Sequence, residues 1–179
     1  SPIAGYQLGV VGSLETTAVA ALPATTRWAA RTVAFAAQSR FAVRATDVAG
    51  NTGAWAPGSP VIIGVTQEAQ AAVRRSSGWT GYASTRSLGG RAMSATRAGA
   101  WTRITFRGSG IALVGPTGPT RGSAEIWLDG VKVRNVSAYA KTSSTLWLLH
   151  AMTVDPRRSH TLEVRVRGTS VSLRRDEAA

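Results

Sequence analysis

Few side chains in this sequence are of the types that perform catalysis. The chain has no cysteine and only two histidines, His150 and His160, among 179 residues. The absence of cysteine removes thiol nucleophiles and zinc–thiolate sites, and neither histidine lies in an HExxH or comparable metal-ligand spacing. His160 follows Ser159 and begins an expected strand. We therefore predict that His160 is a structural residue whose ring bonds to nearby backbone.

The patterns typical of hydrolases are also weak. Gly108-Ser109-Gly110 lacks the five-residue spacing of a nucleophile elbow, and the glycines of a turn explain it better. Glu125 and Asp129 are a close pair of carboxylates on one strand face, but a turn explains Asp129 better. No loop is rich in aspartate, as a calcium site would require. We predict a non-catalytic chain with no cofactor and no metal, or a weak calcium site; a dispersed Ser–His–Asp triad is the remaining catalytic alternative.

Six tryptophans supply flat rings of the kind that stack on sugars. Trp127 alternates with Ile126 and Leu128, and it faces outward if those two residues fill the core. Trp79 and Tyr82 lie in a segment rich in Gly, Ser and Thr, and loops of a sandwich commonly build binding sites. Alternation alone allows Trp147 to point either way. The candidate carbohydrate-binding residues are Trp79, Tyr82, Trp127 and Trp147.

The other tryptophans fit a structural role better. For Trp28, Trp55 and Trp101 we expect packing in the core or against a sheet. A single ring stacked on a sugar contributes on the order of 1 kcal/mol. A module that depends on one or two such rings therefore binds weakly and gains from multivalency.

Positive charge is concentrated in the second part of the chain. Residues 61–179 contain seventeen basic and seven acidic residues, a net of +10 out of the total of +12. A basic domain is typical of binding to nucleic acid, anionic cell-wall polymer or a membrane surface. A coding bias toward arginine and alanine is the alternative, and we favour it because the arginines are scattered at strand-like spacing. The candidate polyanion-binding residues are Arg103, Arg107, Arg165 and Arg167.

Short runs rich in Val, Ile, Thr and aromatic residues, bounded by turn residues, predict strands along most of the chain. Good helix formers are confined to residues 66–75, which fit a strand plus a linker equally well, and no apolar run approaches the length of a membrane span. The Pro-Gly-Ser-Pro run at 57–60 indicates a boundary near 58–66, with domains of 1–60 and 61–179. The expected strands are 6–11, 18–22, 27–35, 40–46, 101–107, 111–114, 123–128, 131–136, 146–150, 161–166 and 170–173.

Turn chemistry between these runs indicates the kind of fold. Asp129-Gly130, between two of the expected strands, is a strong signal for a β-hairpin. Regularly spaced short strands with such turns between them are typical of a sandwich or a jelly roll.

The first part of the chain contains a specific resemblance. Residues 40–51, Arg-Phe-Ala-Val-Arg-Ala-Thr-Asp-Val-Ala-Gly-Asn, followed by Trp55, resemble the last strands of fibronectin-type-III and immunoglobulin-like modules in secreted proteins of high-GC Gram-positive bacteria. The resemblance covers about residues 1–60 and is specific at 40–55. It implies that earlier strands of the module precede Ser1, so we expect an N-terminally truncated module in a fragment of a longer protein.

The second part resembles the galactose-binding-like β-sandwich, a carbohydrate-binding-module-like fold that often follows such a module. The matching segments are Phe106–Pro116, Gly122–Gly130 and His160–Gly168. Relatives usually finish with a further strand that pairs back into the sandwich. Here the sequence ends Arg-Arg-Asp-Glu-Ala-Ala, so we expect that strand to be altered or lost.

Together these patterns predict an all-β chain of two β-sandwiches, one immunoglobulin-like or fibronectin-III-like and one jelly-roll-like. The resemblance implies a non-catalytic ancillary module of an extracellular or cell-surface protein, which binds polysaccharide or cell-wall glycan and does not insert into a membrane. Two alternatives stay open. One is a spacer or assembly module whose outward aromatics are buried against protein partner chains. The other is a binder of anionic polymers, whose affinity would fall steeply with salt.

Overall fold

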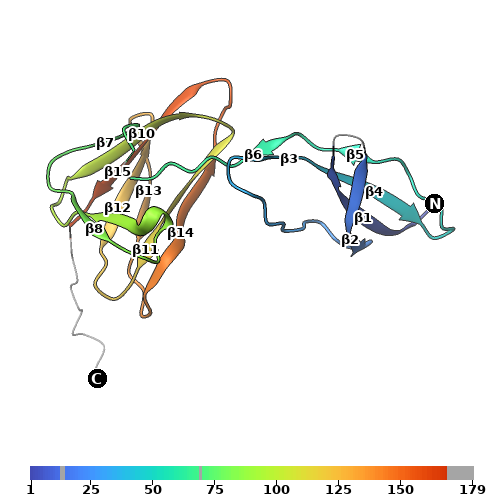
Figure 1. Cartoon of the computed structure of the whole chain (residues 1–179), viewed down its shortest axis with the longest axis horizontal. Helices are drawn as coiled ribbons and strands as arrows, with labels where there is room; N and C mark the ends of the chain where they lie inside the picture. Colours follow the sequence, from blue (N-terminus) through green and yellow to red (C-terminus); the bar gives the residue numbers. More distant parts are fainter. Residues whose placement is uncertain (13–14, 69, 169–179) are drawn as a thin grey trace. The chain divides into compact units, whose positions relative to one another are not determined.

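The computed structural model describes residues 1–12, 15–68 and 70–168 (Figure 1). Its regular structure over these ranges consists of antiparallel β-strands and one 3-10 turn, Leu88–Gly90, which confirms the all-β prediction. None of the helical structure in these ranges is long and apolar enough to cross a membrane. The contacts divide the chain into two units, Ser1–Val65 and Thr66 onward. The expected strand at 170–173 lies outside the described residues.

The first unit is built on a four-stranded antiparallel sheet in the order β2-β1-β4-β5. Leu8 on β1 and Ala42 on β4 are both buried. Their register partners are Val43 and Gly9, so the two side chains lie on opposite faces of this sheet. Residues 61–62 pair with 38–39, so they group with the first unit. The bounds are β1 Ile3–Val11, β2 Thr16–Pro23, β3 Gln38–Ser39, β4 Phe41–Asp47, β5 Ala56–Pro57 and β6 Val61–Ile62.

Two predictions for the first unit were wrong. Residues 27–35 form no strand, and Phe35 makes only an isolated bridge to Ile63. Trp28 is 80% exposed instead of packed. Both results follow from the lack of a partner strand, because the described pairing of this segment is confined to the Phe35 bridge.

Trp55 packs against the sheet, as expected. The Arg44 guanidinium lies 4.4 Å from the centre of the Trp55 ring. A Cβ placed on Gly9 would come within 2.9 Å of that ring, so the glycine makes room for the indole. The Trp55 ring is therefore held between a β1 glycine and a β4 arginine.

The second unit contains a five-stranded antiparallel sheet in the order β13-β12-β15-β10-β7. Over the described part of this unit, two smaller antiparallel pairs accompany the sheet, β11 with β14 and β8 with β9. Within the expected helix or linker at 66–75, the described residues 66–68 and 70–72 are irregular or in turns, and β7 follows them. The bounds are β7 Val73–Arg75, β8 Thr80–Ala83, β9 Arg91–Ser94, β10 Trp101–Arg107, β11 Gly110–Thr117, β12 Ser123–Leu128, β13 Val131–Ser137, β14 Ser144–Thr153 and β15 Ser159–Val166.

The core of the second unit lies between the five-stranded sheet and the β11–β14 pair. Ile126 at the centre is completely buried, and Val136 and Leu162 are buried beside it. Apolar side chains at alternate positions of both layers pack against these three residues, as in a β-sandwich. They are Ile104, Phe106, Ile111, Leu113, Ala124, Met152 and Val164.

The predicted hairpin is present between β12 and β13. Asp129 and Gly130 have φ angles of +50° and +82°, the combination that a type I′ turn requires. This turn brings the Asp129 carboxylate to β15, where it accepts a hydrogen bond from the Thr161 backbone N–H at 2.7 Å. The turn residue therefore also fastens the hairpin to the neighbouring strand.

Candidate functional site

Trp127 lies on the outer face of the five-stranded sheet, the face opposite the core. Its neighbour Ile126 points into the core, so alternation turns the indole outward as predicted. Strand register brings further polar and aromatic side chains to this face from β10 and β15. We call this surface the outer sheet face; it comprises Trp101, Arg103, Glu125, Trp127, Glu163 and Arg165.

Arginines cover the tryptophan rings of the outer sheet face. The Arg165 guanidinium lies 4.0 Å from the centre of the Trp127 ring, and that of Arg103 lies 4.4 Å from the Trp101 ring. The Trp127 indole N–H also donates to Glu125 Oε2 at 3.1 Å. The structure thus brings a carbohydrate candidate and a polyanion candidate together, and a guanidinium occupies the ring face that a sugar would need.

Carboxylates neutralise part of the positive charge on the same face. Glu163 pairs with Arg165, and Lys132 Nζ lies 2.5 Å from Glu125 Oε1. The hydrogen bond from Lys132 lowers the pKa of Glu125 below its ordinary value. Glu125 is therefore a charged structural partner, and it shares no site with Asp129, which bonds instead to β15.

The other two polyanion candidates, Arg107 and Arg167, do not form a continuous basic patch with the outer sheet face. Arg107 donates to the Arg157 carbonyl at 2.9 Å and so ties the end of β10 to the loop before β15. Arg167 follows β15, is exposed, and donates its backbone N–H to the Ser123 carbonyl. Arg103 and Arg165 stack on indoles, as described above. The four arginines thus have different structural surroundings.

Trp79 and Tyr82 lie at β8 and make separate contacts. The Trp79 indole N–H donates to the Trp101 carbonyl at 3.0 Å, which fastens the loop before β8 to β10. An Arg121 N–H donates to the Tyr82 hydroxyl at 3.5 Å, near the limit of a hydrogen bond. Both rings are half-buried.

Trp147 has a different environment from the other candidates. It lies on β14 opposite Gly115 and is 58% exposed, between Leu146 and Leu148, which are also exposed. Across the described parts of the chain, arginines stack on Trp55, Trp101 and Trp127 but not on Trp147. Of the four carbohydrate candidates, Trp147 is the one with an indole accessible to a ligand.

A second exposed aromatic lies close to the same part of β11. Tyr139 is 55% exposed and bridges Gly118, just beyond the end of β11. Ser143 lies against Gly118, since a Cβ on that glycine would come 2.9 Å from the Ser143 hydroxyl oxygen. Sequence reasoning missed Tyr139, although its small neighbours in Ser-Ala-Tyr-Ala were a signal of exposure. We call Tyr139, Ser143 and residues 146–148 the aromatic end of the second unit.

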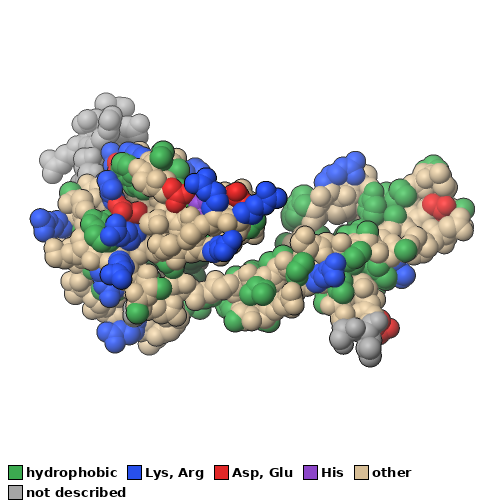
Figure 2. All heavy atoms as spheres, turned by 90° about the horizontal axis from the view of Figure 1, so that it is seen from above, with side chains coloured by type: hydrophobic (Ala, Val, Ile, Leu, Met, Phe, Trp, Pro, Cys, Tyr) green, Lys and Arg blue, Asp and Glu red, His purple; other side chains and the backbone are tan. Residues whose placement is uncertain are grey.

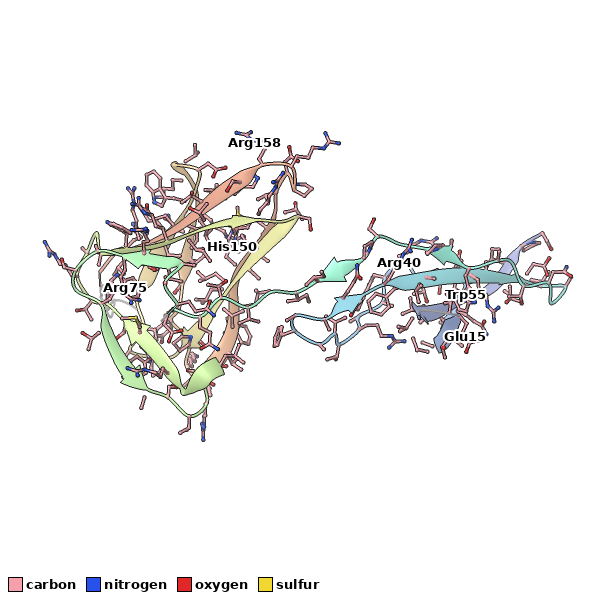
Figure 3. All side chains as sticks on the ribbon, turned by 45° about the horizontal axis from the view of Figure 1, so that its top comes forward. Glu15, Arg40, Trp55, Arg75, His150 and Arg158 are labelled. Carbon is pink, nitrogen blue, oxygen red and sulfur yellow. The ribbon has the colours of Figure 1, made fainter. Side chains whose placement is uncertain are left out.

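Both histidines lie away from these surfaces. His160 is 6% exposed; its Nδ1 lies 2.7 Å from Asp129 Oδ2 and its Nε2 lies 3.0 Å from the Asp155 carbonyl. The ring thus bonds to nearby backbone, as predicted. His150 faces the interior of the unit (Figure 3), and its Nε2 is buried without a partner among the described atoms. The described ranges contain no cluster of three residues able to hold a metal ion.

The His160–Asp129 pair makes stability depend on pH. The hydrogen bond to Asp129 raises the pKa of His160 above 6.5, and bonds from the Thr161 N–H and from His160 lower the pKa of Asp129 below 3.8. The His160 contribution is therefore complete below pH 6.5 and is lost as the pH rises through its folded pKa. The Asp129 contribution is complete above pH 3.8 and is lost as the pH falls through its folded pKa.

We expect the pair to stabilise the second unit most between about pH 4 and 6.5, since both groups are charged there. The measurement is the midpoint of urea unfolding from pH 3 to 9, followed by tryptophan fluorescence, for the parent chain and His160→Gln. The variant should lose the decline of the midpoint above pH 6.5. An unchanged decline in His160→Gln would show that another group causes it.

Comparison with known proteins identifies no family for this chain. No protein-family model matches the chain, and no curated protein matches it. A solved structure of an alpha-L-rhamnosidase from Dictyoglumus thermophilum is similar at 12% identity with a TM-score of 0.36, covering 94% of this chain. The match covers 21% of that protein, so the chain spans about a fifth of its length. A likeness of this degree carries no argument about function, which rests on the residues themselves.

Proposed function

We propose that the chain is a non-catalytic ancillary module of an extracellular or cell-surface bacterial protein, and that its second unit binds polysaccharide or cell-wall glycan. The aromatic end, rather than the outer sheet face, is the proposed binding surface. Trp147 supplies the main stacking ring and Tyr139 a second one.

The exposure of Trp147 is the observation that carries this proposal. Apolar surface of that size is normally buried, and a chain that leaves it in water gains when something covers it. The other candidate indoles already have covers or partners within the unit: Arg165 on Trp127, and the Trp101 carbonyl for the Trp79 N–H. Among the candidate tryptophans of the second unit, Trp147 is accordingly the one whose ring is available for stacking.

The polar surroundings of the aromatic end suit a sugar. A pyranose presents an apolar face to an aromatic ring and hydroxyls at its edge, so it needs flat rings together with neutral hydrogen-bonding groups. Tyr139 contributes a phenolic hydroxyl, and Ser143 contributes an aliphatic one beside Gly118. These hydroxyls favour a hydroxyl-rich ligand at this end of the unit, where Lys141 is an exposed positive charge between them in the sequence.

The test is retention of the full chain on insoluble cellulose, xylan and purified peptidoglycan, each at low and high salt. The variants are Trp147→Ala and Tyr139→Ala, with Trp28→Ala as the matched control, because Trp28 is a still more exposed tryptophan in the first unit. We expect salt-resistant retention on at least one polymer. Loss of one stacked ring should weaken binding about fivefold to tenfold, on the scale of 1 kcal/mol per ring, and the control should bind like the parent.

Other outcomes would assign other functions. Retention that disappears at high salt and is unaffected by Trp147→Ala would contradict the proposal and favour an anionic polymer. No retention on any polymer, together with self-association that Trp147→Ala abolishes, would favour the assembly role. Circular dichroism of each variant confirms that the fold is intact before binding is compared.

A further inference from the structure

Two arginines lie directly opposite each other at one edge of the outer sheet face. Arg74 on β7 and Arg103 on β10 are register partners in adjacent antiparallel strands (Figure 1). Side chains of such partners project from the same face of the sheet a few ångströms apart. Like charges in this arrangement destabilise the strand pair unless a negative charge lies between them.

Carboxylates of the described residues do not supply that negative charge. The ion pairs in this part of the chain join Lys132 to Glu125, His160 to Asp129 and Arg165 to Glu163. Glu163 is the register partner of Arg103 on the side away from β7, but its carboxylate is bonded to the Arg165 guanidinium. The local balance of Arg74, Arg103, Arg165 and Glu163 is therefore two positive charges in excess.

The two arginines also line a surface hollow. It has a volume of about 240 Å³ and is bounded by Arg74, Arg103, Thr105 and the short side chains of Ala71 and Ala72. Figure 2 shows that lysine and arginine side chains stand out from the surface of the second unit on the face in view. The small alanines leave room beside the guanidinium groups, and the volume is sufficient for one phosphate group or one acidic sugar.

Two donors of the hollow, Arg103 and Thr105, are held in place before any ligand binds. The Arg103 guanidinium is stacked on the Trp101 ring at 4.4 Å, which fixes its plane. The Thr105 hydroxyl lies 3.2 Å from that of Thr161, so Thr161 can donate to Thr105 and leave the Thr105 proton free for a ligand. A guanidinium in a fixed plane binds the two oxygens of a phosphate or carboxylate at once.

We propose that the Arg74–Arg103 hollow is a binding site for a single oxyanion group, phosphate or carboxylate. Arg74 and Arg103 neutralise the group, and the Thr105 hydroxyl bonds one of its oxygens. The site is separate from the aromatic end and does not depend on glycan stacking there. If the hollow and the aromatic end bind the same polymer, the hollow would give the module a preference for a polymer that carries an acidic group.

The experiment follows the side-chain Nε–Hε resonances of arginine by ¹H–¹⁵N NMR in the full chain. Inorganic phosphate is titrated in one arm and sodium glucuronate in a second, with neutral glucose as the reference. We expect saturable shifts of the Arg74 and Arg103 resonances with at least one anion and none with glucose. Saturation with phosphate alone assigns a phosphate group, and saturation with glucuronate alone assigns a carboxylate.

Variants separate the hollow from general attraction of anions to a basic surface. Arg74→Gln and Arg103→Gln should each weaken binding at least tenfold, whereas Arg134→Gln, an exposed arginine on β13 at the opposite edge of the sheet, should leave it unchanged. Trp147→Ala should also leave it unchanged, so failure of the glycan proposal would not be mistaken for failure of this one. Equal weakening by Arg134→Gln, or no saturable shift in either arm, would overturn the proposal.

A measurement of stability provides a second readout. In low salt without added anion, Arg74→Gln should raise the unfolding temperature of the second unit, because it removes the repulsion between like charges. The same variant should lose the stabilisation that the anion gives the parent chain. A purely structural Arg74 predicts the reverse, a lower unfolding temperature in Arg74→Gln without anion.

Discussion

Replacement of Ile126 with alanine is expected to lower the free energy of unfolding of the second unit by about 2–5 kcal/mol. Ile126 is completely buried at the centre of the sandwich core, between the five-stranded sheet and the β11–β14 pair. The variant loses the transfer free energy of three carbon atoms and leaves a cavity that the neighbouring β-strands fill only in part. Urea unfolding followed by circular dichroism measures the change.

Val131→Ala is the matched control for Ile126→Ala. Val131 also belongs to the β12–β13 hairpin but is 65% exposed, so its truncation should change stability by no more than about 0.5 kcal/mol. Similar losses in the two variants would mean that the core does not lie on the Ile126 side of the sheet. In that case the assignment of the outer sheet face would be wrong as well.

Gly9→Ala is expected to destabilise the first unit by about 1–3 kcal/mol through overpacking. The new Cβ would lie 2.7 Å from Thr16 Cγ2 and 2.9 Å from two atoms of the Trp55 ring, closer than van der Waals contact permits. The ring would have to move away from β1, and its stacking with Arg44 would be disturbed. Urea unfolding measures the change in stability, and the total tryptophan emission, to which Trp55 contributes, reports the displaced ring.

Gly53→Ala serves as the control for Gly9→Ala. A Cβ on Gly53 would meet only the Ala45 carbonyl at 3.8 Å, an ordinary contact. We expect this variant to match the parent chain in stability and in fluorescence. If Gly9→Ala also left stability and fluorescence unchanged, Trp55 would not be packed on β1.

Most strands of the second unit were predicted correctly because alternation and turn residues are properties of short sequence segments. Alternation in residues 101–107 separates Ile104 and Phe106 on the core side from Arg103 on the outer side, and the structure has them so. Asp129-Gly130 has the turn chemistry that a two-residue hairpin needs. These features depend on neighbours in sequence, so the sequence alone is sufficient to find them.

The errors and omissions concern features that depend on distant residues. Residues 27–35 contain β-branched and aromatic side chains, but a strand also needs a partner, and the segment has only the Phe35 bridge. Alternation predicted that Trp127 faces outward. It could not predict that Arg165, 38 positions later, would cover the ring through the pairing of β12 with β15.

The sequence predicted that the candidate site contains exposed aromatic residues, but not which of the aromatic residues form it. Trp147 was one of four aromatic candidates. Because Trp147 and Trp127 both lie in apolar runs, their sequence context does not show which indole is more accessible to a ligand. The distinction comes from cross-strand neighbours: Gly115 opposite Trp147, and the charged residues of β15 beside Trp127. Tyr139 became a candidate only through its bridge to Gly118.

The most direct test of the proposed function is a ¹H–¹⁵N spectrum of the indole N–H groups, recorded with and without a soluble oligosaccharide of the polymer that retains the chain. The six tryptophans give separate signals, which single Trp→Phe variants assign. We predict that the Trp147 signal shifts on addition of the oligosaccharide while those of Trp127 and Trp28 stay in place. A shift at Trp127 with Trp147 unchanged would contradict the account and move the binding surface to the outer sheet face.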